Sequence, residues 1–304
     1  MKHLTDITAW STAELITLLD LAQSMFDDAG PYERSLPGRL LINLFYEAST
    51  RTRVSFEAAA IRLGMNVINV SAAGSSVEKG ETLEDTFFTV QAMSPDSVVV
   101  RHPEEGAASR LADLADPGVH VINAGDGIAA HPTQALLDAL TLRQALGDFS
   151  GIRVAMVGDI RHSRVARSAI SLLSRLGVKD IRLCGPEEFI PRRESLEGHD
   201  AVSVSDSLEH VVKDVNAIMM LRIQKERITG LHIPSADEYH LRWGLRPEHL
   251  ELASQGCRVL HPGPMNRGVE ISSQVADGPA SLVRAQVTNG LFVRMAVLHH
   301  LLAS

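Results

Sequence analysis

Leu40-Leu-Ile-Asn-Leu-Phe45 and Glu47-Ala-Ser-Thr-Arg-Thr-Arg53 stand one residue apart in the chain. The first segment is short, apolar and free of glycine and proline, so it predicts a buried strand. After the second segment, apolar residues at Val54, Ala58 and Ile61 follow the spacing of one helix face. Gly64 is placed to end that helix. Ser49 is then the expected N-cap residue, with Thr50, Arg51 and Thr52 in the first turn.

The start of this expected helix carries an unusual set of charges. Its first backbone N–H groups have no acceptor inside the helix, and the positive end of the helix dipole favours acidic side chains over Arg51 and Arg53. A doubly negative ligand removes the conflict, because N–H groups, hydroxyls and guanidinium groups all bind phosphate. The alternative is an ordinary capped helix whose arginines face water. The series of hydroxyl and guanidinium groups favours a phosphate site.

The composition indicates the class of fold and excludes one class of partner. The 304 residues suffice for two domains of about 150 residues each. Hydrophobic residues make up 45% and aromatic residues 4%, so Ala, Val, Leu and Ile fill the cores, as in parallel sheets covered by helices. The net charge is −8 and the sequence has no basic block, which argues against nucleic acid as a partner.

Cysteine usage and the N-terminus bear on the compartment. Cys184 and Cys257 lie far apart without metal-ligand spacing, which predicts core thiols in a reducing compartment. The N-terminal residues lack an apolar signal core, and no run approaches the length of about 18 apolar residues that a membrane helix needs. We therefore expect a cytoplasmic protein with no membrane partner.

Strand-like and helix-like segments alternate along the chain. Besides 40–45, strands are expected at 65–70, 97–100, 119–122, 152–157, 180–184, 201–204, 217–221 and 258–260. Helices are expected at 11–28, opened by the capping box Ser11-Thr-Ala-Glu14, and at 49–63, 81–93, 105–115, 132–147, 164–176 and 289–301. The last of these is expected to be amphipathic, and residues 224–245 to be irregular. The alternation predicts an α/β fold of two domains, each a mostly parallel sheet with helices on both faces, with a boundary at Gly147-Asp-Phe-Ser-Gly151.

Polar residues gather where the expected strands end, and open parallel sheets bind ligands beyond those ends. The residues in question are Ser49 to Arg53, Arg101, His131, Gln134, Arg164, Arg222 and the turn Leu260-His-Pro-Gly-Pro264. Each has an ordinary structural explanation: a helix-cap histidine, surface arginines or, for Lys79, a solvated charge. The sequence lacks G-x-G-x-x-G and G-x-x-x-x-G-K-[ST], so dinucleotide binding and nucleotide phosphoryl transfer have no support.

Phe45-Tyr-Glu-Ala-Ser-Thr-Arg-Thr-Arg-Val-Ser-Phe-Glu57 resembles the carbamoyl phosphate signature of aspartate and ornithine carbamoyltransferases. Further motifs resemble the same family, in order and approximate spacing, over residues 40–301. They are Ser75-Ser-Val-Glu-Lys-Gly-Glu-Thr82, Val100-Arg-His-Pro103, Asn123-Ala-Gly-Asp-Gly127, His131-Pro-Thr-Gln134, Val157-Gly-Asp159 with Arg164, Leu221-Arg-Ile-Gln-Lys-Glu-Arg227, and Leu260-His-Pro-Gly-Pro264 followed by Asn266-Arg-Gly-Val-Glu-Ile271. The resemblance implies a carbamoyl phosphate-binding domain at 1–147, an L-aspartate-binding domain at 148–288 and a C-terminal helix at 289–304 that packs back on the first domain.

Two observations favour L-aspartate as the second substrate. Ornithine enzymes of the family typically show a His-Cys-Leu-Pro turn, whereas His261-Pro-Gly-Pro264 has no thiol. Arg222, Gln224 and Lys79 suit a substrate with two carboxylates. The resemblance thus implies transfer of the carbamoyl group of carbamoyl phosphate to the amine of L-aspartate. Carbamoyl transfer to ornithine or another amine, and a non-catalytic anion-binding homologue, are the alternatives.

The resemblance also assigns roles to residues. The phosphate group would be held by Ser49, Thr50, Arg51, Thr52 and Arg101, joined by Ser75 and Lys79 of a neighbouring subunit. The carbonyl oxygen would face Thr52, Arg101 and His131, while Gln134, Pro262 and Gly263 would orient the carbamoyl nitrogen and the amine. The aspartate carboxylates would be bound by Arg164, Arg222, Gln224 and Lys79, and Glu47 and Arg227 would hold the domains closed. The expected catalytic residues are Arg51, Thr52, Lys79, Arg101 and His131.

The expected partners follow from the same resemblance. Apart from the two small-molecule substrates, no metal or other cofactor is expected. The loop at 71–80 would reach into the next subunit, so the resemblance implies a homotrimer with shared active sites. It leaves open whether a regulatory chain or a dihydroorotase-like partner assembles around the trimer. Gly263 stands where some members carry Leu, and little loss is expected because the backbone carbonyl acts there.

Overall fold

The computed structural model describes residues 2–71, 80–192, 196, 198, 200–224 and 234–303. Contacts between residues divide the chain into two compact units. Unit 1 comprises Met1–Leu140 and Val287–Ser304, and unit 2 comprises Thr141–Gln286. Two helices, α5 (Pro132–Leu146) and α11 (Val283–Leu302), each belong partly to unit 1 and partly to unit 2.

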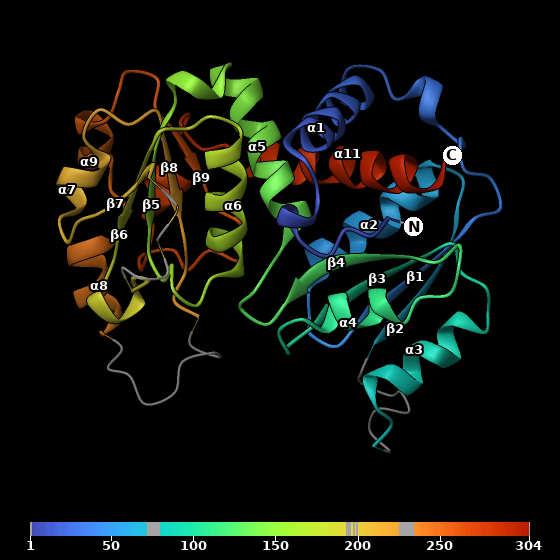
Figure 1. Ribbon diagram of the computed structural model, residues 1–304. Helices are drawn as coiled ribbons and strands as arrows, with labels where there is room; N and C mark the ends of the chain where they lie inside the picture. The colour runs from blue at the N-terminus through green and yellow to red at the C-terminus, as the bar shows by residue number, and fades with distance from the viewer. Residues whose placement is uncertain are drawn as a thin grey trace. The chain divides into compact units, whose positions relative to one another are not determined.

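Unit 1 is built on a four-stranded parallel sheet (Figure 1). Its strand order is β2 (Asn66–Ser71), β1 (Leu40–Phe45), β3 (Ser97–His102) and β4 (His120–Asp126). β1 lies in the middle and is buried from Leu41 to Phe45, as its continuous apolar run requires. In this register Phe45 pairs with Arg101, so the ends of β1 and β3 lie side by side.

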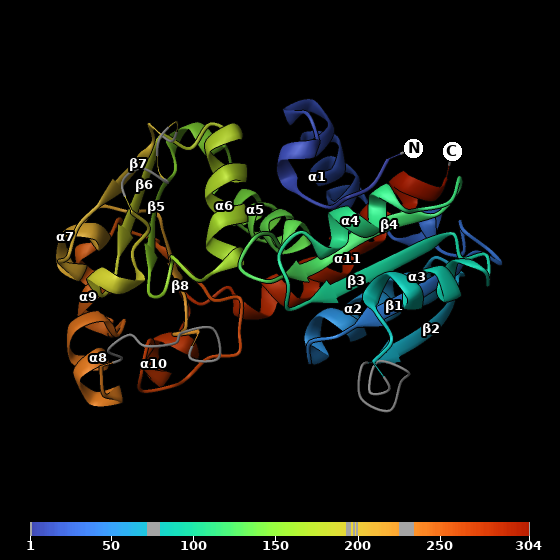
Figure 2. The ribbon, with the colours of Figure 1, turned by 60° about the horizontal axis from the view of Figure 1, so that its bottom comes forward.

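Helices cover both faces of this sheet. α2 (Thr50–Arg62) and the unit 1 part of α11 lie on one face, and α3 (Leu83–Gln91) and α4 (Ala107–Asp113) on the other (Figure 2). α1 (Thr12–Asp27) lies on the same side as α2 and begins with a capping box between Ser11 and Glu14. Apolar side chains of the sheet and of α3 and α4 form one core cluster that includes Leu44, Phe87 and Leu111.

Unit 2 repeats this plan with a five-stranded parallel sheet. Its strand order is β7 (Val202–Val204), β6 (Asp180–Cys184), β5 (Arg153–Val157), β8 (Ala217–Met220) and β9 (Arg258–Leu260). The helices are α6 (Arg164–Arg175), α7 (Leu208–Val212), α8 (Ala236–Trp243), α9 (Pro247–Leu252) and α10 (Ser273–Ala276). α6 lies on one face of the sheet and α7 and α9 on the other (Figure 1).

The structure confirms the predicted α/β fold with two parallel sheets covered on both faces, and the C-terminal helix packs back as part of unit 1. Two expectations were wrong. The segment expected to be irregular contains α8, which begins with a capping box between Ser235 and Glu238. α11 is not amphipathic over its whole length, because six consecutive residues from Val293 to Leu298 are buried. Among the described residues, none of the helices has the length and apolar character that a membrane span requires.

Candidate functional site

The N-terminus of α2 carries the residues expected to bind phosphate. Ser49 is the N-cap residue, in an extended conformation with φ −156°, and within the described part of the chain its hydroxyl makes no capping hydrogen bond. The first turn holds no acidic residue. Thr52 is buried, whereas Thr50 and Arg51 are exposed. The first-turn N–H groups therefore stand beside hydroxyls and a guanidinium group, an arrangement suited to a phosphate dianion.

Arg101 lies at the C-terminal end of β3, next to the end of β1. Its Nη1 donates to the carbonyl oxygen of Ala124 on β4 at 3.0 Å, and its Nε lies 3.3 Å from Oε2 of Glu47. The side chain is 13% exposed. Glu47, which follows β1, and Ala124, on β4, thus hold the guanidinium group at this strand end. Glu47, expected to help hold the domains closed, contacts Arg101 here.

His131 and Gln134 lie at the start of α5 and are both buried. The carbonyl oxygen of His131 accepts the N–H groups of Gln134 and Ala135, so His131 lies at the N-cap position, directly ahead of Pro132. Nε2 of Gln134 donates to Oδ1 of Asp138 at 3.0 Å. A carboxylate only accepts, so this contact fixes the amide orientation and leaves Oε1 of Gln134 as an acceptor for an N–H group.

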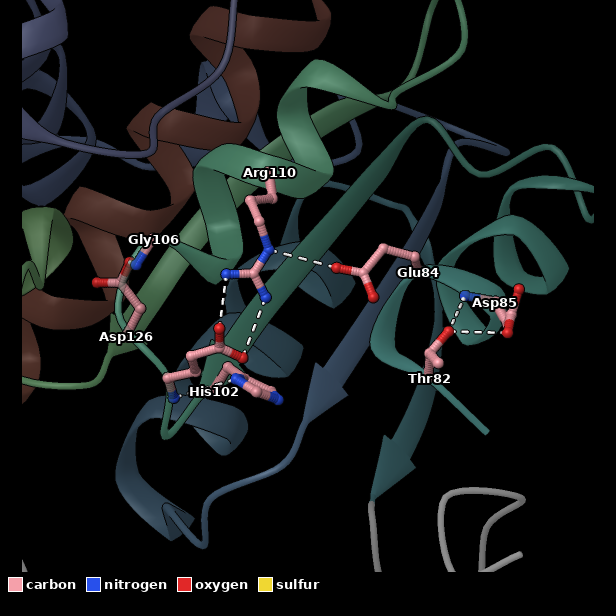
Figure 3. Close-up of polar contacts among 8 residues, drawn as sticks. Thr82, Glu84, Asp85, His102, Gly106, Arg110 and Asp126 are labelled. Carbon is pink, nitrogen blue, oxygen red and sulfur yellow. Dashed lines mark hydrogen bonds and ion pairs between the residues drawn. The ribbon is translucent and has the colours of Figure 1, made fainter. Parts of the chain in front are cut away.

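The loop that follows Arg101 is braced by α4 and α3. Arg110 on α4 donates to both carboxylate oxygens of Glu104, at 3.0 and 3.1 Å, and its Nε donates to Glu84 on α3 at 3.3 Å (Figure 3). Nδ1 of His102 accepts the backbone N–H of Glu104 at 3.1 Å, and the His102 ring stands edge-on to Tyr46. Burial lowers the pKa of His102. The hydrogen bond from Arg110 lowers the pKa of Glu104.

In unit 2, three residues expected to bind L-aspartate lie at strand ends. Arg164 begins α6, after β5, and is buried. Arg222 and Gln224 follow β8, and both are partly exposed. The buried Asp159 connects these two segments, because its Oδ2 accepts the backbone N–H of Gln224 at 3.1 Å while Oδ1 accepts from His162.

The turn after β9 is held by buried groups of unit 2. Nδ1 of His261 accepts the N–H of Gly263 at 2.8 Å, so its Nε2 carries the proton and donates to Oε1 of Glu270 at 3.1 Å. The same Glu270 oxygen accepts the N–H of Asn266. Gly263 has φ 67°, a left-handed conformation that favours glycine. Pro262 and Gly263 are partly exposed, which leaves the turn accessible.

Three expected site residues, Ser75, Lys79 and Arg227, lie outside the described residues. In the described part of the chain, no group of three or more His, Cys, Asp or Glu side chains could hold a metal ion. The sequence argument missed the residues that hold these segments together, among them Arg110, Asp159 and Glu270. Asp159 and Glu270 stand inside family motifs, which could have marked them as site residues. Arg110 lies in none of these motifs.

Two family models together match nearly the whole chain. The family model described as aspartate/ornithine carbamoyltransferase, carbamoyl-P binding domain, matches residues 2–144. The model described as aspartate/ornithine carbamoyltransferase, Asp/Orn binding domain, matches residues 150–301.

Two relatives and one solved structure illustrate the similarity. An aspartate carbamoyltransferase catalytic subunit of Stenotrophomonas maltophilia is 48% identical, over 99% of this chain and 96% of its own. The corresponding protein of Salinispora tropica is 50% identical, over 99% and 98%. The crystal structure of aspartate transcarbamoylase from Trypanosoma cruzi in complex with carbamoyl phosphate and aspartate superposes with a TM-score of 0.87 at 32% identity, covering 98% of this chain and 94% of that one. This chain therefore belongs to the aspartate/ornithine carbamoyltransferase family.

Proposed function

We propose that this chain transfers the carbamoyl group of carbamoyl phosphate to the amine of L-aspartate, giving N-carbamoyl-L-aspartate and phosphate. The observation that carries the proposal is the strand end at which Arg101, held by Glu47 and Ala124, lies beside the acid-free N-terminus of α2. Relatives about 50% identical are named aspartate carbamoyltransferase catalytic subunits. The reaction supplies carbamoyl aspartate for pyrimidine biosynthesis.

The phosphate group is bound by unit 1 in this proposal. Ser49, Thr50, Arg51 and Thr52 present hydroxyls, a guanidinium group and first-turn N–H groups, and Arg101 adds a second guanidinium. The Ser49 side chain supports the assignment, because within the described residues its hydroxyl makes no capping hydrogen bond to α2. Ser75 and Lys79 of a neighbouring subunit complete the set.

The chemical step needs a donor set for the carbonyl oxygen. The unprotonated amine of aspartate attacks the carbonyl carbon, and the carbonyl oxygen gains negative charge in the tetrahedral intermediate. Thr52, Arg101 and His131 stabilise that charge. The carbon–oxygen bond to phosphate then breaks, phosphate leaves with the electron pair, and the new amide nitrogen loses its proton to the departing phosphate. Alignment of two bound reactants contributes about 7–11 kcal/mol to such a step.

Two groups orient the reacting nitrogens. Gln134 offers Oε1 to the carbamoyl NH2, since its own NH2 is bound to Asp138. The carbonyl oxygens of Pro262 and Gly263 accept N–H groups of the carbamoyl group and the incoming amine. In unit 2, Arg164, Arg222 and Gln224 bind the two aspartate carboxylates together with Lys79, because guanidinium forks fit carboxylates.

The assembly and the domain roles are part of the same proposal. Residues 1–147 bind carbamoyl phosphate, 148–288 bind aspartate, and 289–304 return to the first domain. Glu47 and Arg227 form the ion pairs that hold the two domains closed. The active unit is a homotrimer whose loop at 71–80 serves the neighbouring site. The free, buried thiols of Cys184 and Cys257 fit a reducing compartment such as the cytoplasm.

The test is a colorimetric assay of carbamoyl product with purified protein and no added metal. L-aspartate and carbamoyl phosphate should give carbamoyl aspartate, at a rate that rises with pH near neutrality as the attacking amine loses its proton. L-ornithine at the same concentration is the matched control and should give no product. Turnover of ornithine with none of aspartate would refute the proposal.

A further inference from the structure

Two segments of unit 1 that adjoin proposed catalytic residues are bonded to each other. The first is the end of β3, where Arg101 and His102 lie, with the loop that runs on to Gly106. The second follows β4 and leads to His131. Gly127 N–H donates to the carbonyl oxygen of His102 at 2.9 Å. Gly106 N–H donates to Oδ2 of Asp126 at 3.0 Å (Figure 3). One bond in each direction therefore joins the two loops.

The Asp126 carboxylate is the centre of this junction. It is 3% exposed. Besides Gly106 N–H on Oδ2, its Oδ1 accepts Nδ2 of Asn123 and the N–H of Ala130, both at 3.0 Å. A buried carboxylate is costly unless donors surround it, so all three donors must be in place together. These donors come from β4, from the loop before α4 and from the residue before His131.

Gly127 shows how closely the loops approach. Its φ is 45°, and a Cβ atom there would lie 2.9 Å from the backbone nitrogen of Glu105 and 3.1 Å from the carbonyl oxygen of Pro103. Backbone atoms cannot move aside as a flexible side chain can. The loop after β4 is therefore closely packed against the loop after β3. Any added volume at Gly127 must shift one loop against the other.

We propose that Asp126 is the positioning residue that fixes Arg101 and His131 relative to each other for carbamoyl transfer. Arg101 is bonded to Ala124 O, two residues before Asp126, and His131 follows Ala130, whose N–H Asp126 accepts. Asp126 thus connects the segment that binds the Arg101 side chain with the residue that precedes His131. The inference rests on the proposed function, and it assigns to Asp126 a role in the chemical step without contact to substrate.

Asp126→Asn is the main test, with kcat, KM for L-aspartate and the thermal midpoint as readouts. Asn keeps one oxygen for Ala130 and Asn123 but sets an NH2 group against Gly106 N–H, so one of the two bonds between the loops is lost. We expect kcat to fall about 10- to 100-fold, as for a displacement of up to about 1 Å. KM for aspartate should stay within about threefold.

Asp96→Asn is the matched control. Asp96 accepts the N–H of Leu40 at 2.7 Å and pairs with Arg39, at the opposite end of the same strands. It should lower the thermal midpoint to a similar degree and leave kcat unchanged. An equal loss of kcat in both variants would mean that Asp126 acts through stability alone, and the inference would fail.

A double variant separates positioning from general damage. Once His131 is absent, only the placement of Arg101 still matters, so Asp126→Asn should cost less kcat in the His131→Ala background than in the wild type. The same fold-loss in both backgrounds would overturn the inference. If the wild-type protein forms no carbamoyl aspartate, the proposed function itself fails. Failure of the inference and failure of the proposed function are therefore distinguishable.

Gly127→Ala tests the same junction if Asp126→Asn does not fold. Its control is Gly118→Ala, because Gly118 also has a positive φ of 96° but a Cβ there meets nothing within 4 Å. Both changes add backbone strain, whereas the clash with Glu105 and Pro103 arises at Gly127. We expect a kcat loss of about 10-fold or more for Gly127→Ala. Equal kcat in the two variants would overturn the inference.

Discussion

Replacing Arg294 by Met should destabilise unit 1 strongly. Arg294 is 3% exposed, and its Nη1 donates to Ser55 Oγ and to the carbonyl oxygen of Gly290, each at 3.0 Å. Its guanidinium lies 5.1 Å from the ring centroid of Phe56. Burial lowers the pKa of Arg294 to about 10, and Asp138 acts in the opposite direction. The group therefore stays charged at neutral pH and joins α11 to α2.

The magnitude follows from what the substitution leaves behind. Met fills much of the volume but removes two charge-assisted hydrogen bonds and the contact with Phe56. It also removes the cation that interacts electrostatically with Asp138, which is 1% exposed. Removing one of two interacting buried charges costs about 3–5 kcal/mol. Adding Asp138→Asn removes the remaining charge and keeps an acceptor for Gln134, so the double variant should recover about 1–2 kcal/mol.

The assay uses the tryptophans, of which the chain has two. Trp10 lies in unit 1 and Trp243 in unit 2, so Trp243→Phe leaves a fluorophore that reports on unit 1. In that background we expect the urea midpoint to fall with an unchanged m value. Arg62→Met, at an exposed position at the end of α2, is the control and should cost at most about 1 kcal/mol. A loss below about 1 kcal/mol for Arg294→Met, or purely additive effects with Asp138→Asn, would refute the reasoning.

Four further predictions concern the site. His131→Ala should lower kcat by roughly 100- to 1000-fold with the fold retained, and near-normal turnover would return His131 to a helix-cap role. Arg222→Ala should weaken aspartate binding by roughly 10- to 150-fold, judged from KM, and leave carbamoyl phosphate affinity nearly unchanged; equal losses would contradict its assignment. Burial lowers the pKa of His102 from 6.5, so the folded chain binds that proton less readily. The free energy of unfolding must then fall as the pH drops below about 6.5, and it should fall less in His102→Asn. An equal change in urea midpoint between pH 7.5 and pH 5 in the two proteins would disprove this. Mixing inactive Arg51→Ala and Lys79→Ala subunits should restore about one quarter of the sites, since about three quarters of random trimers are mixed and each regains one site in three. No recovery after verified exchange would exclude shared sites.

The sequence predicted those parts of the fold whose signals are local. β1 was placed at its observed residues because a short apolar run between polar segments is itself the signal. Ser49 was placed as the N-cap of α2 for the same kind of reason. α8 was missed although its capping box was present, because eight residues carry little helical periodicity.

Contacts between distant segments were beyond a local argument. α11 was expected to be amphipathic, yet Val293 to Leu298 are all buried, and Arg294 among them runs against the usual exposure of arginine. Asp126 stood inside a quoted motif, but its donor Gly106 lies 20 residues earlier in the chain. Periodicity describes one element at a time, whereas these groups acquire their roles from a second or third element.

Asp126 and Arg294 share a physical property that explains where they stand. Each is a buried charged group whose desolvation is offset only when donors or acceptors from several segments are in position. A partial shift of one segment would leave a buried charge unsatisfied, so such a group makes the arrangement of its segments nearly all-or-none. Apolar packing alone tolerates small shifts at low cost. Carbamoyl transfer, which relies on alignment of two reactants, requires that tighter control. Buried charges that touch no substrate are therefore the places where this chain should be most sensitive to substitution outside the site itself.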